Sequence, residues 1–199
     1  MNAIETFFLE FGFSWSASKA IPYVFCILLG IVLVFVFRKF KPKIVWVFRS
    51  IAFVLFTLPF SVYFSIYPIY EGDFSNQGTK PTSSIQFPAN KALTVVVLPN
   101  CPYCYQSIAL MKKIKKRNPS IPISYWVVSA DTLPTKSAIL KVIPKEFQIQ
   151  QRHDIEQITQ LAQGTFPCFV LSDRNSTVKS WNNNQFGVRA LDEIETFFK

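Results

Sequence analysis

Glycine, cysteine and acidic residues are all scarce in this 199-residue chain. It contains six glycines and four cysteines, and its 12 acidic residues are outnumbered by 21 lysines and arginines, so the formal net charge is +9. So few glycines exclude collagen-like and glycine-rich linker sequences, and four cysteines are too few for a small disulfide-rich scaffold. Half of the residues are hydrophobic and only 17% are charged, which excludes an intrinsically disordered protein. The chain therefore carries much apolar surface that a core or a membrane must cover.

Two long uncharged segments near the N-terminus account for much of this apolar content. Residues 21–37 and 50–70 comprise 17 and 21 residues without a charge. At about 1.5 Å per residue, each helix would span most or all of a ~30 Å hydrocarbon layer. We therefore expect a transmembrane helical hairpin over 21–70, with a connecting loop at 38–49 and an interfacial segment at 1–20.

The charges around the hairpin predict its orientation. The connecting loop holds four cations in the six residues 38–43, whereas acidic residues flank the outer ends of both apolar segments. Short loops rich in lysine and arginine stay in the cytoplasm, so both termini should lie outside it, in the periplasm of a Gram-negative bacterium. Because the cations follow the first apolar segment and a second one comes next, we expect an uncleaved inner-membrane anchor and no signal peptide.

The positive net charge does not indicate a nucleic-acid-binding protein. Six of the 21 cations belong to the hairpin and its flanks, and five more are packed into residues 112–117. That cluster comes at the end of a predicted helix, where cations complement the negative end of the helix dipole. We therefore interpret it as a solvated helix end and expect no nucleic-acid partner.

Beyond a polar linker at 71–91, the sequence alternates between strand-like and helix-like segments. Short runs of β-branched residues predict buried strands, and apolar residues at helical spacing predict helices. The expected order over 92–199 is βαβ, a helical connection and ββα, with strands at 93–98, 123–128, 167–171 and 177–181 and helices at 102–117, 152–163 and 188–198.

A Cys-Pro-Tyr-Cys motif lies where the first of these strands passes into the first helix. Unsatisfied backbone N–H groups and the positive end of the helix dipole favour the thiolate of Cys101 at this point. Pro102 suits the first helical turn, and Tyr103 should line the exposed rim beside the first cysteine. Cys104 lies one turn further and can resolve a mixed disulfide at Cys101. We therefore expect Cys101 to be the attacking thiol and Cys104 to be the resolving thiol.

The second half of the chain resembles the thioredoxin superfamily. The resemblance rests on the CxxC motif inside a βαβ unit and on Thr165-Phe166-Pro167 before the next strand, where the family has its cis-proline loop. It implies a thioredoxin-like α/β fold, a cis peptide bond at Pro167, and a substrate-binding loop in which the main chain of Phe166 pairs with an extended substrate. It also implies thiol–disulfide oxidoreductase activity with no cofactor beyond the redox-active Cys101–Cys104 disulfide, protein thiol or disulfide substrates, and an integral membrane redox partner.

One departure from the family concerns proton transfer. The strand at 93–98 has no acidic residue, whereas thioredoxins bury an aspartate there as a proton acceptor.

Other cysteines leave alternative interpretations open. Cys168 directly follows the expected cis-proline, and it is either an inert core residue or a third thiol close to the pair. Together with Cys101, Cys104 and His153 it could hold a soft metal ion, as in a thioredoxin-fold copper chaperone. A solvated histidine on a polar helix is the simpler interpretation of His153, and we expect no metal. A noncatalytic assembly factor for a membrane complex is a further alternative. Cys26 lies inside the first apolar segment, where packing explains it.

Overall fold

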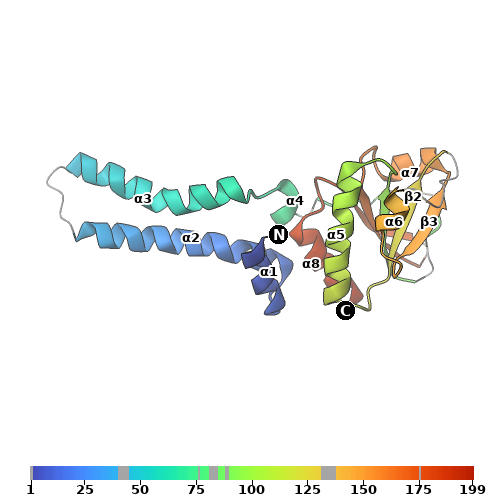
Figure 1. Cartoon of the computed structure of the whole chain (residues 1–199), viewed down its shortest axis with the longest axis horizontal. Coiled ribbons are helices and arrows are strands. Elements are labelled where there is room, and N and C mark those ends of the chain that lie inside the picture. Colours follow the sequence, from blue (N-terminus) through green and yellow to red (C-terminus); the bar gives the residue numbers. More distant parts are fainter. Residues whose placement is uncertain are drawn as a thin grey trace. The chain divides into compact units, whose positions relative to one another are not determined.

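The chain divides into two compact units, Met1–Tyr70 and Glu71–Lys199. The computed structural model describes residues 2–39, 45–75, 77–80, 85–87, 90–130, 138–174 and 176–199. Part of the expected cytoplasmic loop, residues 40–44, and part of the expected helical connection, residues 131–137, lie outside them. The elements labelled in Figure 1 are α1 (Ala3–Glu10), α2 (Trp15–Arg38), α3 (Val45–Ile66), α4 (Glu71–Phe74), β1 (Ala92–Val97), α5 (Pro102–Arg117), β2 (Ile123–Val128), α6 (Ala138–Val142), β3 (Gln148–Arg152), α7 (Ile155–Leu161), β4 (Cys168–Asp173), β5 (Ser176–Asn182) and α8 (Val188–Phe198).

Two long helices make up most of the N-terminal unit. α2 begins at Trp15, earlier than expected, because Ser14 caps it: the Ser14 hydroxyl accepts a hydrogen bond from the backbone N–H of Ala17 at 3.1 Å. α3 ends at Ile66, earlier than the expected residue 70, and Pro68 follows, which cannot donate the hydrogen bond that continues a helix.

α2 and α3 pack against each other and leave many apolar side chains exposed. Gly30 permits a close approach, since a Cβ at this position would overlap the backbone of Phe56. The rings of Tyr23 and Tyr63 meet edge to face with centroids 4.9 Å apart. With mean hydropathies of 2.8 and 1.8, both helices are long and apolar enough to cross a membrane, so this unit has the length and composition of a membrane anchor.

The C-terminal unit is built on a five-stranded sheet in the order β3-β2-β1-β4-β5. β1, β2 and β3 are parallel, β4 runs antiparallel to β1, and β5 runs antiparallel to β4. Every residue of β1 and β2 is buried, as central strands covered on both faces require. α5 and α8 lie on one face, where Arg117 and Glu195 form a 2.8 Å ion pair between them, and α7 covers the other (Figure 1). This is a thioredoxin-like fold, and the predicted fold class is confirmed.

The connection between β2 and β4 differs from the expectation in one respect. Besides the helices α6 and α7 it contains the strand β3, which pairs in parallel with β2. The β3 sequence QIQQR is polar and largely exposed, and it pairs through its backbone, so no hydrophobic alternation marks it as a strand. Consequently α7 begins at Ile155, and His153 lies between β3 and α7, not on a helix as expected.

The described parts of 71–91, expected to be a linker, are attached to the C-terminal unit. Thr79 exchanges backbone hydrogen bonds of 2.7 and 2.8 Å with Ser180 of β5. Phe87 is buried and stacks on Trp126, with ring centroids 4.9 Å apart. A polar composition dominates this segment, so the few side chains that anchor it leave no periodic pattern in the sequence.

Candidate active site

Cys101 occupies the position that caps the N-terminus of α5. Its φ and ψ of −91° and 115° are extended, so the helix begins at Pro102, which has no N–H to leave unpaired. The Cys101 sulfur accepts a hydrogen bond from the backbone N–H of Cys104 at 3.3 Å, as a serine or aspartate oxygen does in other helices. An N–H group and the positive end of α5 therefore face this sulfur.

The two cysteines of the motif differ in accessibility. Both are free thiols, but Cys101 is half-buried, whereas Cys104 has no exposed surface, and Tyr103 between them in the sequence is exposed. Burial raises the pKa of the Cys104 thiol well above its ordinary value, and the hydrogen bond with Cys101 raises it further, while a backbone hydrogen bond involving Leu98 lowers it. Cys101 is therefore the more accessible of the two thiols.

The loop before β4 lies beside the first cysteine. The Phe166–Pro167 peptide bond is cis. The Phe166 carbonyl oxygen lies 3.8 Å from Cys101 Sγ, within reach of a hydrogen bond from the thiol. Pro167 is buried, whereas Thr165 is exposed and its hydroxyl donates to the carbonyl of Ala162 at 3.0 Å. The tertiary fold thus brings this loop and the head of α5 into one site.

Cys168 follows the cis-proline but lies in an apolar environment. It pairs with Val96 across the sheet and belongs to a buried cluster on the α7 side that includes Trp126, Ile158 and Val170. Burial raises the pKa of its thiol to about 12. The CPYC motif lies at the head of α5, which covers the opposite face, so this placement favours the interpretation of Cys168 as a core residue.

His153 is exposed, and its Nδ1 lies 3.0 Å from the backbone oxygen of Ser129. Across the described ranges, no three His, Cys, Asp or Glu side chains are grouped so that they could hold a metal ion. Cys26 belongs to α2, in the other unit. The arrangement therefore offers no support for a soft-metal site built from these residues.

Two hydroxyl side chains that no sequence motif singles out accompany Cys104. The Ser107 hydroxyl donates to the backbone oxygen of Cys104 at 2.7 Å. Tyr125 of β2 is fully buried, and both Ser107 and Cys104 perturb its pKa. The apolar run ISYWVV predicts only that its residues are buried, and it does not single out Tyr125. The alternation of its side chains would have pointed to Tyr125 once the face covered by α5 was known.

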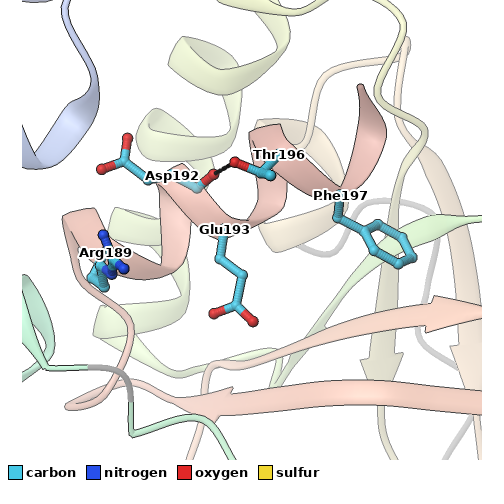
Figure 2. A pocket seen from close by; sticks show the side chains of 5 residues that line it. All are labelled: Arg189, Asp192, Glu193, Thr196 and Phe197. Atoms are coloured by element: carbon cyan, nitrogen blue, oxygen red, sulfur yellow. Dashed lines mark hydrogen bonds between the residues drawn. The ribbon is translucent and has the colours of Figure 1, made fainter.

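A hollow elsewhere on the C-terminal unit is formed by α8. It has a volume of about 320 Å³ and is lined by Arg189, Asp192, Glu193, Thr196 and Phe197 (Figure 2). Glu193 is paired with Lys179 at 2.8 Å, and the Thr196 hydroxyl donates to the backbone oxygen of Asp192 at 2.8 Å. No residue of the CPYC motif or the cis-proline loop lines it, so it is not part of the candidate active site.

Solved structures resemble this chain, whereas no protein-family model and no curated protein matches it. A secreted Mycobacterium tuberculosis disulfide oxidoreductase homologous to E. coli DsbE is 18% identical over 55% of this chain and 82% of its own, with a TM-score of 0.42. Apo Sco1 from Thermus thermophilus is 12% identical over 65% of this chain and 97% of its own, with a TM-score of 0.44. StoA from Bacillus subtilis is 12% identical over 61% and 98%, with a TM-score of 0.39.

Proposed function

We propose that this chain is a membrane-tethered thiol–disulfide oxidoreductase that works outside the cytoplasm. The arrangement around Cys101 carries the proposal: its half-buried sulfur accepts an N–H hydrogen bond at the head of α5 and lies 3.8 Å from the Phe166 carbonyl oxygen. Cys104 is fully buried behind it. An accessible attacking thiol backed by an inaccessible resolving thiol is the division of roles that thiol–disulfide exchange requires.

In the reducing direction, the Cys101 thiolate attacks one sulfur of a substrate disulfide. A bond forms between Cys101 and that sulfur, and the other substrate sulfur leaves with the electron pair. Cys104 then loses its proton and attacks Cys101, so the Cys101–Cys104 disulfide forms and the remaining substrate sulfur departs as a thiolate that takes up a proton. Two electrons pass from the protein to the substrate. Oxidation of a substrate dithiol follows the same steps in reverse.

Protein segments in extended conformation are the proposed substrates. The main chain around Phe166 would pair with such a segment by strand addition, which tolerates many side chains. Tyr103, which is 57% exposed, offers an apolar contact beside the reactive sulfur, and Thr165 borders the same loop. The Cys101–Cys104 pair supplies the redox chemistry by itself, so we propose no cofactor or metal.

The hairpin would hold this chemistry at a membrane surface. Its two helices have the length and apolarity to span a bilayer. The cations at 38–43 favour a cytoplasmic loop, so the proposed topology places both termini and the C-terminal unit on the extracytoplasmic side. An integral membrane redox partner would restore the pair after each turnover, and tethering both proteins to one membrane raises their effective concentration.

Insulin reduction by the full-length protein in detergent tests the proposal, with dithiothreitol as the electron source. Wild type should accelerate the reaction, and Cys101→Ser should abolish the acceleration. Cys104→Ser should accumulate a mixed disulfide, because the first exchange still takes place. Cys168→Ala is the matched control and should stay active, since that thiol lies on the α7 side of the sheet. Acceleration that survives Cys101→Ser would contradict the proposal.

A further inference from the structure

The chain enters the C-terminal unit beside the start of α8. This unit begins at Glu71, the first residue of α4. Gly72 permits a close approach, since a Cβ at this position would overlap the backbone of Gln185 in the loop before α8. The side chain of Asp73 is buried and accepts a hydrogen bond of 3.5 Å from the backbone N–H of Val188, the first residue of α8. The entry point is therefore fixed to the start of α8.

This entry point and Cys101 lie at the same end of the sheet. Cys101 follows the C-terminal end of β1, where Val96 pairs with Cys168, the first residue of β4. Cys168 pairs in turn with Asn182, the last residue of β5. The backbone N–H of Gln185 donates to the Asn182 carbonyl at 3.1 Å, so the loop that α4 contacts also turns at this end. The opposite end of the sheet lies about 20 Å away, because the strands between the two ends have about six residues.

The segment that joins the proposed anchor to this entry point is short. Four residues, 67–70, lie between the end of α3 and the start of α4. Two of them contact α2: the backbone oxygen of Tyr67 accepts a hydrogen bond from the Tyr23 hydroxyl, and the ring centroid of Tyr70 lies 5.6 Å from Lys19 Nζ. Four residues span at most about 14 Å even when fully extended. The start of α4 therefore stays within about 14 Å of the end of α3.

The same segment carries residues that favour a bilayer surface. Tyr67 and Tyr70 follow the apolar length of α3, and both are exposed. Tyrosine is enriched where a membrane helix meets the headgroup region. In the proposed topology, α3 therefore leaves the hydrocarbon layer immediately before the chain enters the C-terminal unit. The end of the sheet that carries Cys101 is then the end tied to the bilayer surface.

We propose that Cys101 exchanges with disulfides and dithiols held at the bilayer surface, so that its redox partner is an integral membrane protein whose reactive cysteine pair lies at headgroup level. The inference rests on the proposed function and on the proposed anchor. When the partner is oxidised, the Cys101 thiolate attacks its disulfide, and Cys104 then displaces the partner from Cys101. Two electrons pass to the partner, which leaves as a dithiol. The reverse sequence oxidises a partner dithiol.

The test uses the reduced full-length protein in liposomes that contain a phosphatidylethanolamine with a pyridyl disulfide on its headgroup. The Cys101 thiolate attacks the sulfur on the lipid side, and pyridine-2-thione leaves with the electron pair and is followed by its absorbance. Cys104 then attacks Cys101, the Cys101–Cys104 disulfide forms, and the lipid departs as a thiol. Soluble 2,2′-dipyridyl disulfide measures the reactivity of the same sulfur without the membrane constraint. Cys101→Ser should remove both reactions.

A second lipid varies the height of the disulfide above the bilayer. It carries the same pyridyl disulfide at the end of a long polyethylene glycol chain, which spreads the group through the solution next to the membrane. Each rate is divided by the rate of free cysteine with the same lipid, which corrects for the accessibility of the probe. Wild type should react at least about threefold faster with the headgroup disulfide, because its sulfur and that disulfide share a thin layer.

A longer connection should remove this preference. An insertion of about 20 glycine and serine residues between Tyr70 and Glu71 gives a flexible chain with an end-to-end distance of about 27 Å. The rate with the headgroup disulfide should fall by about two- to tenfold, and the rate with dipyridyl disulfide should stay the same. The same insertion placed after Lys199 is the matched control, because it leaves the connection to α3 intact and should change neither rate.

Three outcomes decide between the inference and the function on which it rests. Equal wild-type rates with the two lipids would overturn the inference, and so would an undiminished rate of the lengthened protein with the headgroup disulfide. If the insertion also slows the reaction with dipyridyl disulfide, it has disturbed the fold, and the comparison of the two lipids with wild type decides. If Cys101→Ser reacts with dipyridyl disulfide as fast as wild type does, the proposed function itself fails.

Discussion

The two units of this chain differ in whether their apolar segments are exposed or buried. In the most apolar stretches of α2 and α3, 17% and 0% of the residues are buried, although the mean hydropathies are 2.8 and 1.8. In β1 and β2 every residue is buried. Apolar composition by itself does not decide between these outcomes. Segment length does, because six-residue runs bounded by turn residues fit a sheet, whereas runs of about 20 residues match a bilayer.

The largest expected effect comes from a charge placed in each unit. Val95 is fully buried in the central strand, so Val95→Asp should cost about 4 kcal/mol or more and unfold the C-terminal unit. Phe53 is 68% exposed on α3, and Phe53→Asp should make the free energy of membrane insertion less favourable by about 3 kcal/mol. It should not change the melting of the C-terminal unit. Circular dichroism and membrane fractionation of the full-length variants measure the two effects. A folded Val95→Asp protein would remove the contrast between the units.

The next effect tests where the boundary between the units lies. Phe87 is 4% exposed and stacks on Trp126, so Phe87→Ala should lower the free energy of unfolding of the C-terminal unit by about 3 kcal/mol. Urea titration of the full-length protein measures this change. Gln86→Ala removes an exposed neighbour and should leave the midpoint in place. A midpoint that is equally unaffected by Phe87→Ala would mean that the segment 71–91 acts as a linker after all.

A smaller effect is expected from replacing a glycine at which two backbone segments lie very close together, and each unit has one such glycine. A Cβ on Gly187 would overlap the backbone of Gly72, so Gly187→Ala should destabilise the C-terminal unit by about 1–3 kcal/mol. Gly30 is the counterpart in the hairpin, where a Cβ would overlap the backbone of Phe56. Gly30→Ala should loosen the contact between α2 and α3 and leave the melting of the C-terminal unit unchanged. Thermal unfolding of both variants tells whether the two units respond independently.

The smallest expected effect is that of a surface ion pair. Arg152 donates hydrogen bonds of 2.6 and 2.9 Å to both carboxylate oxygens of Asp154, and they hold the pKa of Asp154 below its ordinary value. A lowered pKa in the folded state stabilises the fold above the unfolded-state pKa, and this contribution is lost as the pH falls through the folded-state pKa. Asp154→Asn should therefore cost less than about 1 kcal/mol at neutral pH and nothing in strong acid. Urea unfolding at the two pH values measures the difference, and an equal cost at both would exclude the ion pair as its source.

Sequence patterns predicted some elements of the fold far better than others. α5 and α8 span the expected residues 102–117 and 188–198, because local signals mark their ends. In contrast, β3 and the attachment of 71–91 depend on backbone pairing and a few anchors, which produce no periodicity. For the candidate site, motifs pointed to the cysteine pair and the loop at Pro167. Ser107 and Tyr125 carry no motif, so the sequence offered nothing to single them out.

The sequence by itself determined the two long apolar helices, the placement of a cysteine at the head of α5 and four of the five strands, all but β3. Each of these depends on residues close together in sequence: their hydrophobic period, their length and their capping groups. Only the tertiary structure decided that Cys104 and Tyr125 are fully buried and that Cys168 belongs to the cluster on the α7 side of the sheet. Those outcomes depend on which helix covers which face of the sheet, because successive side chains of a strand point to opposite sides.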